Sequence, residues 1–122
     1  MKTKVKKSGR ILIINACLLI LSFTMWGCSK SGSSATPGAN EVFIQGMAFT
    51  PGSITVAANT TITWTNKDGV SHTVTSDTGV TPSFDSGTIN PNKTWSHLFA
   101  TSGTFPYHCT IHPNMTATVV VD

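Results

Sequence analysis

Three side chains that can bind a metal ion lie close together near the C-terminus, in the sequence Cys-Thr-Ile-His-Pro-Asn-Met from Cys109 to Met115. The cysteine thiolate and the methionine thioether are soft ligands, and the imidazole of His112 suits copper, zinc, iron and nickel. A second histidine would complete a set of two histidines and one cysteine with a weak axial methionine, which is diagnostic of a blue-copper electron-transfer site. His72 is the candidate, because it follows the turn-forming residues Asn66–Gly69 and so can point into a cluster of loops.

Each of these residues taken alone has a more common structural interpretation. A single cysteine is usually a small buried apolar residue and a single methionine usually fills a gap in a core, while a single histidine usually lies on the surface. Three metal-competent side chains within seven residues, however, together favour a metal site. Of the other two cysteines, Cys17 lies in a predicted N-terminal signal and Cys28 lies at its expected cleavage point. Cys109 then has no disulfide partner, which supports this interpretation.

The first 27 residues have the pattern of a secretory signal, with five basic residues in the first ten and an apolar run over residues 11–26. Gly27 and Cys28 follow this run, and a small residue before a cysteine at that point resembles the cleavage box of bacterial lipoproteins. We therefore expect residues 1–27 to be a lipoprotein-type signal peptide and Cys28 to carry the lipid that anchors the protein to a membrane. The alternatives are an uncleaved anchor helix and ordinary cleavage further along, for example after Ala35. All three place the folded part outside the cytoplasm, in the periplasm or at the cell surface.

The rest of the chain divides into a short linker and one small domain. Residues 28–40 are rich in serine, glycine and proline and predict a flexible tether, and residues 41–122 are long enough for one domain. From Cys28 onward three lysines stand against five acidic residues, which gives a net charge of −2. This composition excludes a basic nucleic-acid-binding face, so no nucleic-acid partner is expected. The segment is also too short for the βαβ repeats of a nucleotide-binding fold.

Short segments of alternating apolar and polar residues, separated by turn signals, predict that the domain consists of strands. In Ser53–Ala57, for example, Ile54 and Val56 lie on one face, and eighteen threonines from residue 28 onward suit strands rather than helices. Strands are expected at Glu41–Gln45, Met47–Phe49, Ser53–Ala57, Thr60–Thr65, His72–Ser76, Thr94–Ala100, Thr104–Cys109 and Thr116–Val121, with a short one near Ser83–Ser86. Seven or eight strands at this spacing indicate an all-β fold, a two-sheet antiparallel Greek-key sandwich.

Two blocks of this domain resemble the cupredoxins, the blue copper proteins, and in particular the plastocyanin and amicyanin group. One block runs from Met47 through Trp64 to His72, and the other is Gly-Thr-Phe-Pro-Tyr-His-Cys-Thr-Ile-His-Pro-Asn-Met from Gly103 to Met115. The spacing Cys-x2-His-x2-Met resembles that of amicyanin. The resemblance implies one copper ion, cycling between Cu(I) and Cu(II), with the ligands His72, Cys109, His112 and Met115.

Three positions depart from the pattern of that group. Thr73 stands where an asparagine usually ties the two ligand loops together by hydrogen bonds, and its hydroxyl group is expected to preserve the connection in altered form. Asn59 stands where a turn glycine is usual, and asparagine tolerates the positive φ that such a turn requires. Ile111 replaces a proline that often precedes the second histidine ligand. None of these changes removes a ligand.

Two histidines, His97 and His108, are outside this ligand set. His108 alternates with inward-facing residues in the expected strand Thr104–Cys109 and should face solvent. A second surface route to the copper at His108 is one alternative, whereas a type 2 copper site, as in copper nitrite reductases, would need three histidines. His97 shares a face with Trp95 and Phe99, where a partly buried, structural histidine is expected.

The resemblance implies that the second histidine ligand, His112, lies near the surface among apolar residues, where a redox partner would dock. We expect this electron-port rim to be formed by Met47, Val70, Pro113 and Asn114.

The expected function is one-electron transfer by a membrane-tethered, monomeric protein with unidentified redox partners. Four protein ligands leave no open position on the metal for a substrate, and the His-x-His pairs of multicopper oxidases are missing from the sequence, so an enzyme is not expected. The alternative is a periplasmic copper-storage or chaperone protein on the same fold. Such carriers tend to use exposed methionine- and histidine-rich clusters, and the sequence after Cys28 has only two methionines and no run of histidines, which favours electron transfer. A third class, a metal-free adhesion-type sandwich, is disfavoured by the ligand loop.

Overall fold

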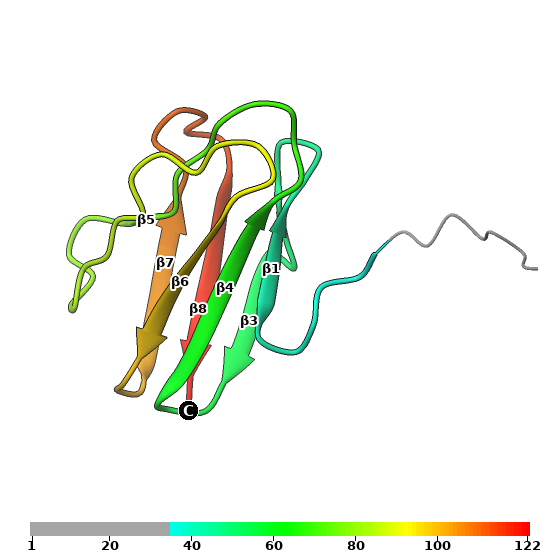
Figure 1. Cartoon of the computed structure of the whole chain (residues 1–122). Coiled ribbons are helices and arrows are strands. Elements are labelled where there is room, and N and C mark those ends of the chain that lie inside the picture. Colours follow the sequence, from blue (N-terminus) through cyan, green and yellow to red (C-terminus); the bar gives the residue numbers. More distant parts are fainter. Residues whose placement is uncertain (1–34) are drawn as a thin grey trace, which may run out of the picture. The chain divides into compact units, whose positions relative to one another are not determined.

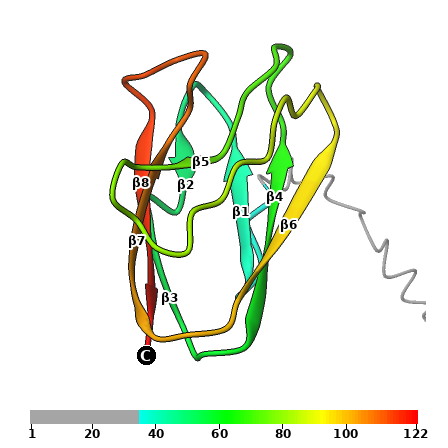
Figure 2. The same cartoon turned by 90° about the vertical axis from the view of Figure 1, so that its left-hand side faces the viewer.

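The computed structural model describes residues 35–122. This part of the chain contains eight strands and no helix. The strands are β1 (Glu41–Ile44), β2 (Phe49–Thr50), β3 (Ser53–Val56), β4 (Thr60–Asn66), β5 (Thr75–Ser76), β6 (Thr94–Phe99), β7 (Gly103–His108) and β8 (Thr116–Val121). They form two four-stranded sheets, in the orders β2-β1-β4-β6 and β3-β8-β7-β5. The sheets lie face to face (Figure 1; Figure 2), which confirms the all-β sandwich expected from the sequence.

The sheets are mixed rather than purely antiparallel. Strand β1 runs parallel to β4, and β3 runs parallel to β8, whereas the other four strand pairs are antiparallel. The parallel pairs arise because several connections cross between the sheets, whereas among the strands described only the consecutive pairs β1–β2 and β7–β8 are antiparallel neighbours in one sheet. The turn Ala57–Asn59, for example, joins β3 in one sheet to β4 in the other, and Asn59 takes the expected positive φ, at 66°.

The core is built from the alternating residues of these strands. On β7, Phe105 and Tyr107 are buried as expected, and on β4 Ile62 and Trp64 are fully buried. Each large apolar side chain that is buried in this way contributes roughly 1.5–3 kcal/mol to folding. The indole Nε1 of Trp64 donates a hydrogen bond of 3.1 Å to the hydroxyl oxygen of Tyr107, so the polar atom that the tryptophan brings into the core has a partner.

Three segments differ from the expected strands. The segment His72–Ser76 contains only the two-residue β5, and His72 makes a single isolated bridge to Ile89. The amide of Val74 donates to the hydroxyl oxygen of Ser86, whereas in a longer strand it would donate to a backbone carbonyl of the neighbouring strand. Near Ser83–Ser86 only one bridge forms, at Asp85, and Met47 lies outside β2 because its φ of 61° is incompatible with a strand.

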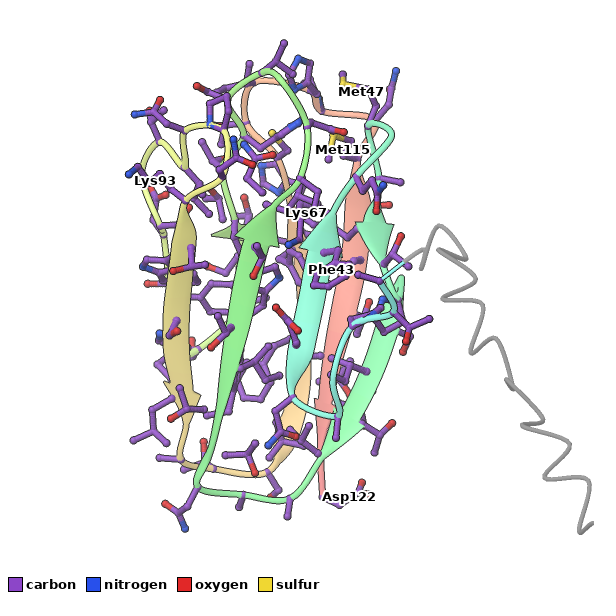
Figure 3. All side chains as sticks on the ribbon, turned by 45° about the vertical axis from the view of Figure 1, so that its right-hand side comes forward. Phe43, Met47, Lys67, Lys93, Met115 and Asp122 are labelled. Carbon is purple, nitrogen blue, oxygen red and sulfur yellow. The ribbon has the colours of Figure 1, made fainter. Side chains whose placement is uncertain are left out.

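The loops that carry the metal-competent side chains meet at one end of the sandwich. Met47 and Met115 both lie at this end in Figure 3, whereas Asp122 lies at the opposite end. The strands β1, β4 and β7 point toward the loop end (Figure 1), so the segments that follow them are brought close together. The fold therefore assembles the candidate site from segments that are far apart in the sequence.

The expected signal peptide, Cys28 and the first part of the tether lie outside the described residues. Residues 35–40, which belong to the expected tether, contain no strand. No helix capable of crossing a membrane occurs in the described part of the chain.

Candidate metal centre

The side chains of His72, Cys109 and His112 converge at the loop end of the sandwich, with potential ligand atoms that all lie within 4.8 Å of one another. The Cys109 Sγ lies 3.8 Å from the Nδ1 of each histidine, and the two Nδ1 atoms are 3.1 Å apart. His72 and Cys109 are fully buried, and His112 is partly exposed. The structure thus brings together three of the four residues that the sequence singles out, around one point.

Two short backbone arrangements hold these side chains in place. His72 exchanges hydrogen bonds with Ile89, from the His72 amide at 3.2 Å and to the His72 carbonyl at 2.8 Å. Cys109 directly follows β7, and its amide donates to the carbonyl oxygen of Met115 at 3.0 Å. The Met115 amide in turn donates to the carbonyl of His112 at 2.9 Å, so the loop from Cys109 to Met115 closes tightly on itself.

Met115, the fourth residue of the expected ligand set, lies beside this cluster. It is the last residue of the ligand loop, its side chain is buried, and its backbone bonds to Cys109. Figure 3 shows it at the loop end of the sandwich. Its role as a weak axial ligand is part of the proposal below.

Thr73 links the loop of His72 to the loop of Cys109. Its backbone amide donates to the Cys109 Sγ at 3.3 Å, and its hydroxyl oxygen accepts from the amide of Thr110 at 2.8 Å. The hydroxyl groups of Thr73 and Thr110 also lie 3.0 Å apart, within hydrogen-bonding distance. The structure therefore contains the loop connection that was expected from Thr73 in place of asparagine.

Asp68 is a site residue that sequence reasoning missed. Its carboxylate Oδ2 lies 3.0 Å from Nε2 of His72, on the side of the imidazole ring that faces away from Cys109. Partial burial would raise the pKa of Asp68, but hydrogen bonds from the amides of Met47 and Gly46 and the contact with His72 outweigh burial and hold the pKa below its ordinary value. The available signal was an acidic residue four positions before a candidate ligand, but the sequence Asn-Lys-Asp-Gly is equally typical of a turn.

The expected electron-port residues are on the surface. Met47 and Val70 are about half exposed, at 47% and 49%, and Pro113 and Asn114 are exposed as well. Ile111 was not expected at this surface, yet it is 47% exposed and belongs to the ligand loop itself. The described domain therefore carries three exposed large apolar side chains on the loops that contain or adjoin the expected ligand residues.

The two remaining histidines lie where the sequence places them. His108 is partly exposed and its Nδ1 lies 2.6 Å from a carboxylate oxygen of Asp77. His97 is partly buried, stacks on Trp95 with ring centroids 5.5 Å apart, and contacts Phe84 and Phe99 edge-on or tilted. Burial lowers the pKa of His97, which agrees with a structural histidine.

The donor set of this cluster, two imidazole nitrogens and one buried thiol with a thioether nearby, fits copper better than a hard cation such as magnesium or calcium. The amide of Thr73 donates a hydrogen bond to the sulfur atom, and the thiolate is the form of cysteine that binds metal. The residues present therefore match the chemistry of a copper site.

Comparison with known proteins agrees with this geometry. Residues 17–121 match the family model of the cupredoxin-like domain. The amicyanin-alpha of Methylorubrum extorquens is 34% identical over 98 residues, which cover 79% of this chain and 82% of that protein. The plastocyanin of Scenedesmus fuscus is 32% identical over 74 residues, covering 54% of this chain and 76% of that protein.

Solved structures with the same fold include copper proteins. The Cu(I) form of a methionine-to-alanine variant of amicyanin superposes with a TM-score of 0.65 and 31% identity, covering 73% of this chain and 87% of that one. A purple cupredoxin from Nitrosopumilus maritimus superposes with a TM-score of 0.62 and 27% identity, covering 67% and 98%.

Proposed function

This chain belongs to the cupredoxin-like family, and on that premise we propose that it is a type 1 copper protein that carries single electrons outside the cytoplasm. Its cofactor is one copper ion, which when bound accepts and releases one electron by changing between Cu(II) and Cu(I). His72, Cys109 and His112 would hold the metal through Nδ1, Sγ and Nδ1, and Met115 would supply a weak thioether ligand. The observation that carries this proposal is the convergence of these two imidazole nitrogens and one thiol sulfur within 4.8 Å.

The residues around the site support electron transfer because they fix its geometry and bury two of its side chains. His72 and Cys109 are fully buried, and the Thr73 hydroxyl group joins the loops from which they project. A change of one electron is fast when little has to move, so a site held by hydrogen bonds within a rigid sandwich suits a carrier. The similarity to amicyanin and plastocyanin also supports an electron carrier rather than an enzyme.

The docking surface of the carrier is the exposed rim beside His112. It consists of Met47, Val70, Pro113 and Asn114, to which the structure adds Ile111. An apolar rim loses its water easily, and without strong ion pairs a partner can leave again. Small, weak interfaces of this kind are typical of electron-transfer partners.

The rate of electron self-exchange between oxidised and reduced copies tests this proposal without a known partner. Val70→Glu places a negative charge on the rim, and two copies that dock rim to rim then repel each other. We expect the exchange rate to fall about tenfold, which corresponds to about 1.4 kcal/mol in the barrier, while the visible spectrum stays unchanged.

Leu98→Glu is the matched control, because Leu98 on β6 is 52% exposed, almost as exposed as Val70, but lies outside the ligand loops. It should leave the exchange rate close to that of the wild type. A Val70→Glu variant that exchanges electrons as fast as the wild type would place the docking surface elsewhere, with His108 as the next site to test. Equal slowing by both variants would mean that only net charge matters. Exchange that is slow in the wild type would favour a copper store or chaperone.

We also propose that the protein is exported and held at a membrane by a lipid on Cys28. The support for this is the sequence of residues 1–28, with its basic start, apolar run and Gly-Cys end. A membrane-held carrier would meet its redox partners within the reach of the tether.

A further inference from the structure

One carboxylate connects the buried ligand His72 to the exposed rim. Oδ2 of Asp68 lies 3.0 Å from Nε2 of His72 and also accepts a hydrogen bond of 3.0 Å from the amide of Met47. The other oxygen, Oδ1, accepts a hydrogen bond of 2.6 Å from the amide of Gly46. Three donors from two loops thus meet on a single side chain.

Asp68 is itself held firmly. Its backbone amide donates to Oδ1 of Asn66 at 2.9 Å. The side-chain amide of Asn66, a fully buried residue at the end of β4, donates to the carbonyl oxygens of Val70 and Ile89 at 2.8 and 2.9 Å. This network fixes the loop from Asn66 to Val70, so the carboxylate is presented to His72 in a defined direction.

The contact determines which nitrogen of His72 carries a proton. A carboxylate only accepts hydrogen bonds, so the short contact with Asp68 requires the proton to be on Nε2 of the imidazole. The lone pair of the neutral ring is then on Nδ1, the atom that lies 3.8 Å from the Cys109 Sγ and 3.1 Å from the Nδ1 of His112. Histidine ligands commonly donate their other ring N–H to a carboxylate in this way, and the partner tunes both affinity and potential.

We propose that Asp68 is a positioning residue of the copper centre, which fixes the tautomer and ring orientation of His72 and supplies a negative charge that favours Cu(II). The proposal rests on the proposed copper function. Because the same carboxylate binds the amides of Gly46 and Met47, it also ties the Met47 side of the electron-port rim to a copper ligand.

A purely structural role is the competing explanation, since an aspartate in a turn often accepts backbone amide hydrogens. That role accounts for the bonds from Gly46 and Met47 but not for the contact with His72. The two explanations differ for Asp68→Asn. The asparagine keeps one acceptor oxygen, which can still accept the hydrogen bond from Nε2 of His72, but it lacks the negative charge.

The first test uses the metal-free protein and is independent of copper. At a pH of about 8, above the usual pKa of histidine, nitrogen NMR of the imidazole rings should show His72 as the Nε2–H tautomer with a slowly exchanging proton. Asp68→Asn should keep this signal, and Asp68→Ala should lose it. A wild-type His72 that is protonated on Nδ1, or a signal that survives in Asp68→Ala, would overturn the proposal even if the protein proves to bind copper.

The second test uses the copper-loaded protein. Asp68→Ala should weaken Cu(II) binding by about 10- to 100-fold, the usual effect of removing a partner of a histidine ligand. Asp68→Asn should bind Cu(II) within a few-fold of the wild type but have a higher reduction potential, because the negative charge near the metal is gone. An unchanged potential in Asp68→Asn would contradict the electrostatic part of the proposal.

Asp77→Asn is the matched control, because it removes the same charge from another His–Asp pair, formed with the outward-facing His108. It should leave the His72 tautomer unchanged and shift the potential much less than Asp68→Asn. Equal shifts in the two variants would mean that only net charge matters and would remove the argument for positioning. A protein that shows the expected His72 tautomer but binds no copper would refute the copper function and leave the hydrogen bond in place.

Discussion

Thr73 joins the loop of His72 to the loop of Cys109 through its hydroxyl group and its backbone amide. The residue is buried, its hydroxyl oxygen accepts a hydrogen bond from the Thr110 amide, and its backbone amide donates to the Cys109 sulfur. Valine has nearly the same shape but no hydroxyl group. The contribution of the oxygen atom can therefore be measured separately from that of packing.

We expect Thr73→Val to lower the free energy of unfolding by about 1–3 kcal/mol, because the hydroxyl group has three hydrogen-bonding partners, the Thr110 amide and the hydroxyl groups of Thr75 and Thr110, and each hydrogen bond contributes about 1 kcal/mol. Denaturant unfolding of the metal-free protein measures the change. Thr61→Val on β4 is the control, because Thr61 is exposed and that substitution should change stability by no more than about 0.5 kcal/mol. Equal stability of Thr73→Val and the wild type would show that the loops are joined without this hydroxyl group.

Met115 offers a second test at the residue scale. Leucine has a similar volume, so Met115→Leu should keep the fold but remove the thioether. The axial ligand of a blue copper site tunes its reduction potential, so we expect the potential and the visible spectrum to shift while copper remains bound. A variant with the wild-type potential would mean that Met115 is only a core residue.

At the scale of the strands, the sequence predicted most boundaries to within one residue. The six expected strands that correspond to β1, β3, β4, β6, β7 and β8 agree with the structure at this level. Their alternating pattern is strong because one face of each strand is buried in the core. The same pattern does not show which strands are neighbours, so the two parallel pairs were not expected.

The segments around His72 and Asp68 could not be read in the same way. Between Val74 and Ser86 side-chain hydroxyl groups replace part of the strand hydrogen bonding, so the expected strand His72–Ser76 shrinks to β5. Asp68 lies in a sequence that is typical of a turn, and it also forms a hydrogen bond with His72. Its role as a partner of His72 can be seen only from the three-dimensional contact. The proposed ligand residues could be found by sequence analysis because three of the four lie in one short loop.

The burial of His97 on the aromatic face of β6 should make the stability of the fold depend on pH. His97 lies among Trp95, Phe84 and Phe99, and burial there lowers its pKa below the ordinary value of 6.5. In the unfolded chain the pKa returns to the ordinary value, so between the two values the unfolded state binds more protons than the folded state. Stability from this residue is therefore fully present above about pH 6.5 and is lost as the pH falls toward the folded pKa.

Replacing His97 with glutamine removes this dependence. We expect the unfolding midpoint of the wild type to fall more steeply between about pH 8 and pH 5 than that of His97→Gln. The comparison of the two slopes isolates His97 from the other histidines. Identical slopes in the two proteins would contradict the burial argument.

At the scale of the whole molecule, the charge distribution separates the leader from the folded domain. Five of the eight basic residues lie in the first ten positions, before the apolar run, and the chain from Cys28 onward is slightly acidic. This arrangement suits a leader that is recognised by the export machinery and a domain that works in another compartment.

Cys28→Ala tests the predicted attachment of lipid. The wild type should incorporate radiolabelled fatty acid and be found in the membrane fraction, whereas the variant should remain an unprocessed precursor without label. Cys17→Ala is the control, because Cys17 lies within the apolar run and should be removed with the signal peptide. A mature wild-type protein that begins at a residue other than Cys28 would show that the lipoprotein prediction is wrong.

The measurement that most directly tests the central claim is the visible absorption spectrum of the protein during titration with Cu(II). We expect an intense thiolate-to-copper charge-transfer band and a blue colour that saturates at one copper per chain, because the Cys109 sulfur and two imidazole nitrogens lie within 4.8 Å of one another. Cys109→Ser, which keeps both histidines, should bind copper without the intense band. A wild-type protein that stays colourless when loaded with Cu(II) under oxidising conditions would contradict the claim that this site is a blue copper centre.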